Sequence, residues 1–93
     1  MEPDEETILT VAQIVRDCEA MAQASLAKDF EEARFRARLV AEKAVVANLP
    51  AVAAAATHAI ERLGPAGSVP RSNHGAAILR VASALDAFWF DAH

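Results

Sequence analysis

The chain has 93 residues, 54% of them hydrophobic, and a net charge of -4, which predicts a single helical domain over residues 1–93. Residues 1–29 carry seven acidic side chains against Arg16 and Lys28, and this balance argues against nucleic acid as a partner. The single cysteine cannot form an internal disulfide, no secretory pattern opens the chain, and the longest uncharged run, residues 44–60, is too short to span a membrane. We therefore expect a cytoplasmic protein that does not use a membrane as a partner.

The first predicted helix begins at Asp4, whose side chain can accept hydrogen bonds from the free amides of the first turn. Its core stripe is expected to consist of Ile8, Val11, Val15, Cys18, Ala22 and Leu26, with Ile14 and Met21 at the edge. Burial within such a stripe would raise the pKa of Cys18 and keep the thiol neutral, so we do not expect a nucleophile there.

The second predicted helix spans residues 29–48 and has apolar stripes on two opposite sides. Asp29 and Glu32 resemble a capping box after a very short turn, so this helix should run antiparallel to the first. One stripe is narrow and consists of Phe35, Leu39 and Val46, whereas the opposite side is broad and small: Ala33, Ala37, Val40, Ala41, Ala44, Val45 and Ala47. Either the helix is central and buried on both sides, or one side is left for a partner.

The charged residues of this helix fit a solvated surface. Glu32 and Arg36 are one turn apart and should pair, while Arg34, Arg36 and Arg38 point in different directions around the helix.

Pro50 must break or kink the helical run near Asn48, and Asn48 could cap a third helix. This helix should run to Leu63, because Gly64 and Pro65 then form a helix stop signal. A fourth helix should follow from Ser72 or Asn73. The expected core faces are Val52, Ala56, Ala59, Ile60 and Leu63 on the third helix and Ile78, Val81, Ala82, Leu85, Phe88 and Trp89 on the fourth. The sequence therefore predicts an all-α, antiparallel four-helix bundle; the alternative is a three-helix arrangement in which the second and third helices form one Pro-kinked helix.

No catalytic, metal-binding or cofactor-binding pattern is apparent. The three histidines, His58, His74 and His93, lack paired spacing on one helical face. His58 lies opposite the core face of the third helix, where it is either a solvated side chain or a phosphoacceptor. Leu79 and Phe90, opposite the core of the last helix, are a second and smaller candidate contact site.

The stretch from Asp29 to Glu61 resembles the second and third helices of histidine phosphotransfer (HPt) domains. The resemblance rests on an acidic helix start, an Arg-rich turn, Lys43, the run Ala47-Asn48-Leu49 and an Ala-rich helix that ends in Ile60-Glu61. The family motif His-x-Leu-Lys-Gly, aligned on Lys43, falls on residues 40–44, where only the lysine is retained. The phosphoacceptor histidine is absent.

The resemblance implies an HPt-like bundle without phosphotransfer, a non-enzymatic interaction module that binds receiver or kinase domains. In this register the stripe of Phe35 would face the core and the small side would face outward. The predicted interaction surface is therefore Ala33, Ala37, Val40, Ala41, Lys43 and Ala44. The alternatives are a phosphate carrier that uses His58, and a homodimeric scaffold or small toxin-neutralising protein.

Overall fold

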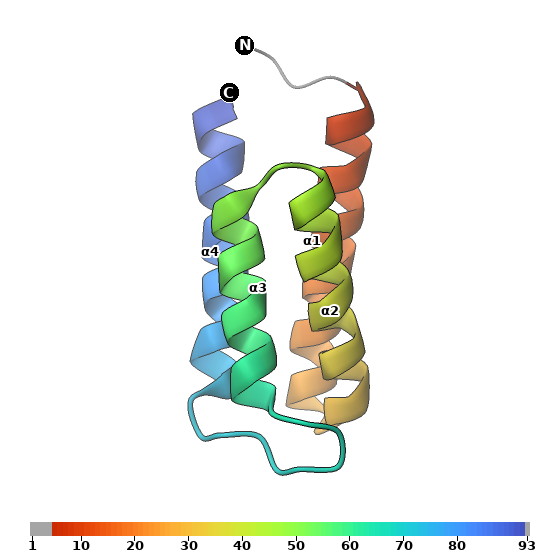
Figure 1. The fold of residues 1–93 in the computed structure, drawn as a ribbon, viewed down its shortest axis with the longest axis vertical. Coiled ribbons are helices and arrows are strands. Elements are labelled where there is room, and N and C mark those ends of the chain that lie inside the picture. The colour runs from red at the N-terminus through yellow and green to blue at the C-terminus, as the bar shows by residue number, and fades with distance from the viewer. Residues whose placement is uncertain (1–4, 93) are drawn as a thin grey trace.

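The computed structural model describes residues 5–92, with side chains up to residue 88, and contains four helices: α1 (Glu5–Leu26), α2 (Phe30–Val46), α3 (Pro50–Leu63) and α4 (His74–Ala92) (Figure 1). The expected Asp4 cap, the side chains of Trp89 and Phe90, and His93 lie outside the described part. Successive helices run antiparallel, which confirms the predicted four-helix bundle.

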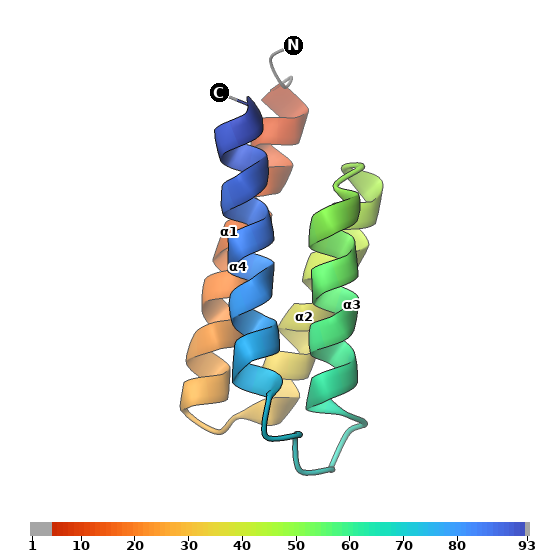
Figure 2. The same cartoon turned by 90° about the vertical axis from the view of Figure 1, so that its left-hand side faces the viewer.

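The helices form a rod of 42 × 19 × 18 Å in which each helix packs against the next one along the chain and α4 returns to α1. The first turns of α1 and the last turns of α4 extend beyond the turn that joins α2 to α3, as both views of the ribbon show (Figure 2). None of the helices in the described range is sufficiently long and apolar to cross a membrane.

The two short turns share one geometry. After α1, the Lys28 amide donates to Ser25 and the Asp29 amide donates to Ala24, and Lys28 takes a positive φ of 62°. After α2, the Asn48 amide donates to Val45 and the Leu49 amide donates to Ala44, and Asn48 takes a positive φ of 59°. This pattern satisfies the last carbonyls of each helix and reverses the chain.

Asn48 therefore ends α2, and the expectation that it caps the next helix is wrong. Leu49 occupies the cap position without a side-chain hydrogen bond, and Pro50 is the first residue of α3, where a missing amide hydrogen costs nothing. α2 and α3 are thus separate helices. Gly64 ends α3 at a φ of 76°, as its position in the sequence predicted.

The core confirms the predicted face of α3 and, on α4, the burial of Ile78, Val81 and Leu85, with Phe88 half-buried against them, whereas Ala82 is exposed. On α1 the expected stripe is rotated. Ile14 and Met21, placed at its edge, are fully buried, whereas Ile8, Val15 and Leu26 are exposed. The buried positions of α1 are Val11, Ile14, Asp17, Cys18, Met21 and Ala24. Their spacing of three and four residues faces α2 on one side and α4 on the other.

Candidate interaction surface

Most of the small side of α2 lies in the core of the bundle, although Val45, which was placed on that side, is 70% exposed. Ala33, Ala37, Val40 and Ala44 are each 0% exposed, and Ala41 is half-buried against them. The prediction that these residues form an interaction surface is wrong for the folded chain, as is the register that turned Val40 outward. The physical reason is that small side chains allow α1 and α3 to approach α2 closely and to pack their larger residues against it.

The narrow stripe of large residues faces outward instead. Phe35 is 52% exposed and Val46 86% exposed, with half-buried Leu39 between them. Helix α2 is therefore not buried on both sides. The sequence correctly showed two apolar sides, but residue size and not hydrophobicity decides which one the bundle can accommodate.

Lys43, the remaining residue of the predicted surface, belongs to an ion-pair network between α1 and α2. Its Nζ lies 2.7 Å from Oδ2 of Asp17, and Nη1 of Arg36 lies 2.9 Å from the other carboxylate oxygen. Arg36 also pairs with Glu32 at 3.0 Å, as predicted. The Asp17 side chain is only 6% exposed, and each of its oxygens has a cationic partner.

The same network reaches Phe35, the aromatic residue of the outward stripe. The Arg36 guanidinium carbon lies 5.7 Å from the centre of the Phe35 ring, within cation–π range. Hydrogen bonds from the guanidinium to Asp17 and Glu32 raise the pKa of Arg36. Phe35 thus lies beside a cation that is itself fixed by α1.

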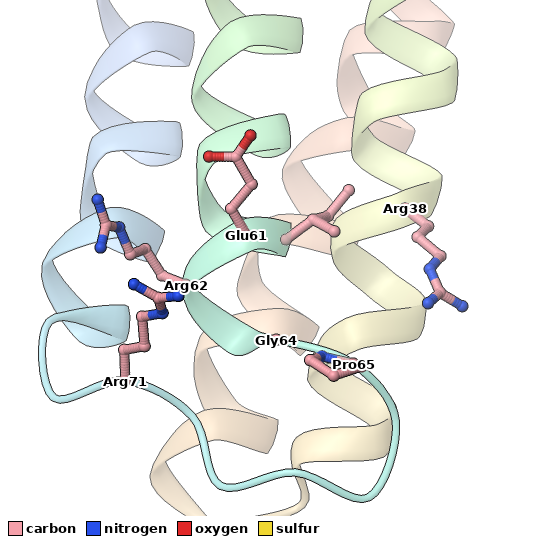
Figure 3. Close-up of a pocket in the computed structure, with 7 residues that line it drawn as sticks. Arg38, Glu61, Arg62, Gly64, Pro65 and Arg71 are labelled. Atoms are coloured by element: carbon pink, nitrogen blue, oxygen red, sulfur yellow. The ribbon is translucent and has the colours of Figure 1, made fainter.

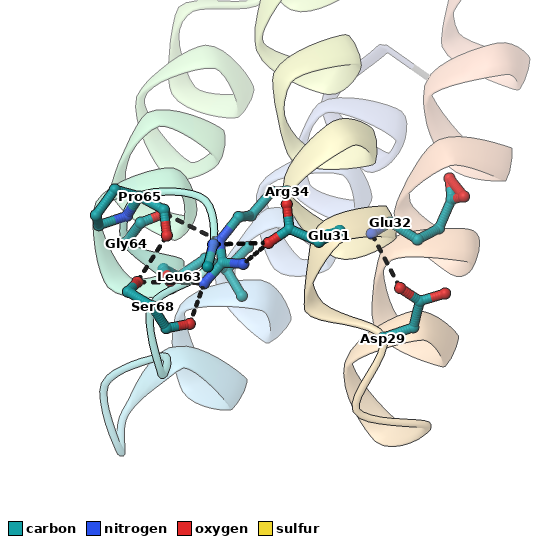
Figure 4. A network of polar contacts seen from close by, with 9 residues as sticks. Asp29, Glu31, Glu32, Arg34, Leu63, Gly64, Pro65 and Ser68 are labelled. Carbon is teal, nitrogen blue, oxygen red and sulfur yellow. Dashed lines mark hydrogen bonds and ion pairs between the residues drawn. The ribbon is translucent and has the colours of Figure 1, made fainter.

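Arg34 is buried, contrary to the expectation of a solvated side chain, and it holds the end of α3 (Figure 4). Its Nε donates to the Gly64 carbonyl at 3.0 Å, and its Nη2 donates to the carbonyls of Leu63 and Ser68 at 2.8 and 2.7 Å. Nη1 pairs with Glu31. Carbonyls at a helix end lack partners within the helix, so Arg34 caps α3 from a neighbouring helix.

Glu31 extends this contact into the loop. Its carboxylate accepts a hydrogen bond of 3.0 Å from the Gly67 amide. This bond, followed by the charge of Arg34, holds the pKa of Glu31 below its ordinary value of 4.5. The loop between α3 and α4 is therefore attached to α2 by two side chains.

Asp29 caps α2, since its Oδ1 accepts from the Glu32 amide at 3.3 Å. The reciprocal half of the predicted capping box does not form. The Asp29 amide instead donates to Ala24, and the Glu32 carboxylate binds Arg36.

A cationic hollow of about 480 Å³ opens between α2, the end of α3 and the loop (Figure 3). It is lined by Arg38, Ile60, Glu61, Arg62, Gly64, Pro65 and Arg71. Arg38 comes from α2 and lies on the opposite side of the hollow from Arg62 and Arg71. No sequence pattern indicated this cluster, because its arginines come from three separate segments.

The other candidate residues are not brought into a reactive arrangement. Burial, with smaller contributions from Asp17 and Glu19, raises the pKa of Cys18 from 9.0 to about 12, as the sequence predicted in direction. His58 is half-buried on α3, and its role as a phosphoacceptor stays a prediction. Leu79 is 67% exposed on α4. The described residues include no cluster of three or more His, Cys, Asp or Glu side chains that could hold a metal ion.

No protein-family model, curated protein or solved structure matches this chain.

Proposed function

We propose that the protein is a cytoplasmic, non-enzymatic interaction module and that a partner protein covers the outward stripe of α2, defined as Phe35, Leu39 and Val46. The observation that carries this proposal is the exposure of Phe35 (52%) and Val46 (86%) on a helix whose opposite side already supplies the core. Single exposed apolar residues are common on protein surfaces. Phe35 and Leu39 lie one turn apart and Val46 lies on the same side two turns further, and apolar residues gathered on one exposed side are typical of a contact site.

The stripe is suited to binding because its aromatic residue lies against a side chain that is held in place. Arg36 lies against the Phe35 ring and is held by Asp17 and Glu32. Little side-chain freedom is then lost when a partner covers the ring. Aromatic side chains are enriched among the residues that dominate binding energy.

The resemblance to HPt domains makes receiver and kinase domains the first partners to test, now against the outward stripe and not the alanine side. A second copy of the chain is the alternative occupant, and it would give a symmetric contact of α2 with α2.

The experiment compares the wild-type chain with Phe35→Ser and with Leu9→Ser, which changes an apolar residue of similar exposure (59%) on α1. Binding of purified receiver and kinase domains is measured by calorimetry, and self-association by sedimentation equilibrium. We expect Phe35→Ser to weaken binding by about thirtyfold, the effect of losing one dominant aromatic contact, and Leu9→Ser to bind as the wild type does. Equal binding by all three proteins would contradict the assignment of the surface, provided that circular dichroism shows all three folded.

A further inference from the structure

The cationic hollow contains arginines that have no structural partner. Arg34 and Arg36 are each engaged by carboxylates or carbonyls. Across residues 5–88, by contrast, the guanidinium groups of Arg38, Arg62 and Arg71 form no hydrogen bond or ion pair; Arg38 affects Glu31 only through its charge. The Arg62 Nε is buried and has no acceptor, which is unusual for a donor that has lost its water.

The backbone fixes two of these arginines relative to each other. The Arg71 amide donates to the Arg62 carbonyl at 2.9 Å, which ties the loop to the last turn of α3. Arg34 holds the intervening carbonyls of Gly64 and Ser68. Like charges that line one hollow repel each other, and an anion placed between them would relieve that repulsion.

We propose that this hollow is a binding site for an organic phosphate. A phosphoryl group carries close to two negative charges and has three acceptor oxygens, which suits the guanidinium groups of Arg62 and Arg71 on one side of the hollow. Ile60 and Pro65 also line the hollow and offer apolar contact to the organic part of the ligand. Glu61 is the only acidic residue among those that line the hollow, and in Figure 3 its carboxylate points away from the loop. This site does not depend on the α2 stripe.

The proposal can be tested by NMR titration of the amide signals of Gly64 and Arg71 at constant ionic strength, with phenyl phosphate, inorganic phosphate and succinate as probes. We expect saturable shifts with both phosphates, tighter binding of phenyl phosphate because of its apolar ring, and the weakest binding for succinate. Arg71→Ala should weaken phenyl phosphate binding at least about tenfold, the effect of losing a charge-assisted hydrogen bond. Glu61→Gln should tighten it by removing a negative charge.

Arg80→Ala is the matched control, because Arg80 is exposed on α4 and does not line the hollow. It should bind phenyl phosphate as tightly as the wild type. Three results would overturn the proposal: shifts that rise linearly without saturation, an equal loss of binding in Arg80→Ala and Arg71→Ala, or succinate bound as tightly as phosphate. Arg71 is an exposed loop residue whose backbone bond is retained in the alanine variant, so the fold should survive the change.

Discussion

Replacement of Arg34 tests most directly what holds the end of α3 to α2. The side chain is 4% exposed and supplies the partners of the Leu63 and Gly64 carbonyls. In Arg34→Ala, the buried Leu63 carbonyl loses its donor, which alone costs about 1–3 kcal/mol, and the charged hydrogen bonds to the loop are lost as well. We expect a total loss of about 3–4 kcal/mol in the free energy of unfolding, a large fraction of the total for a small domain. The midpoint of thermal unfolding should fall by about 12–32 °C.

Arg34→Lys separates geometry from charge. Lysine keeps the positive charge but replaces the planar fork with a single ammonium group, so it cannot serve Gly64, Leu63 and Ser68 together. We expect about half of the alanine effect, measured by urea unfolding followed with circular dichroism. Arg38→Ala, one turn further along the same helix and exposed, is the control and should stay within about 0.5 kcal/mol of the wild type. If Arg34→Lys is as stable as the wild type, the bidentate geometry is not what stabilises this end of the bundle.

Four further predictions follow from single side chains. Because the folded-state pKa of Glu31 is lowered, the stability from its contacts is present above pH 4.5 and is lost as the pH falls through the folded-state pKa. Acid unfolding curves of Glu31→Gln should lack this pH-dependent loss of stability. Because the pKa of Cys18 is raised to about 12, the unfolded thiol ionises first and stability falls between pH 9 and pH 12; Cys18→Ala should flatten that slope in alkaline urea titrations. Lys28→Gly should raise the free energy of unfolding by about 0.5–1 kcal/mol in urea, because it removes the cost of a positive φ. Ala37→Leu should lower the free energy of unfolding by about 1–3 kcal/mol through overpacking, whereas Phe35→Ser should change this free energy by less than about 0.5 kcal/mol. If urea unfolding shows the larger loss for Phe35→Ser, then α2 faces the other way.

Residues that act on the backbone made the helix boundaries predictable. Pro50 can only begin a helix, Gly64 supplies the positive φ that ends one, and Asp29 caps α2 as its side-chain chemistry requires. These effects depend on a few neighbours in sequence. They were therefore predictable before the packing of the bundle was known.

The orientation of α2 could not be predicted in the same way. Hydrophobicity alone favours Phe35 inside, yet the space beside α2 is taken by fully buried side chains from the neighbouring helices, Ile14, Met21 and Leu63 among them. The fit of large residues against Ala37 and Ala44 depends on which helices lie beside α2, and this is information from the three-dimensional structure.

Arg34 was unpredictable for a related reason. Its acceptors at Leu63, Gly64 and Ser68 lie 29 to 34 residues further along the chain. Nothing near Arg34 in the sequence distinguishes it from Arg38, which remains exposed. The same distance in sequence concealed the cluster of arginines that lines the hollow.

Packing of the bundle explains the positions of most charged and small residues of α2. The residues that packing does not explain are the candidates for a functional role. Arg34 caps α3, while Arg36 and Lys43 neutralise buried Asp17. The outward stripe of α2 and the arginines of the hollow have no comparable structural role among the described residues. Stability alone would favour a polar side chain in place of the exposed phenyl ring of Phe35. It would also favour hydrogen-bond partners for the arginines that line the hollow. Arg38 lines the hollow and follows Phe35 by about one helical turn on α2, so both features include side chains of this helix.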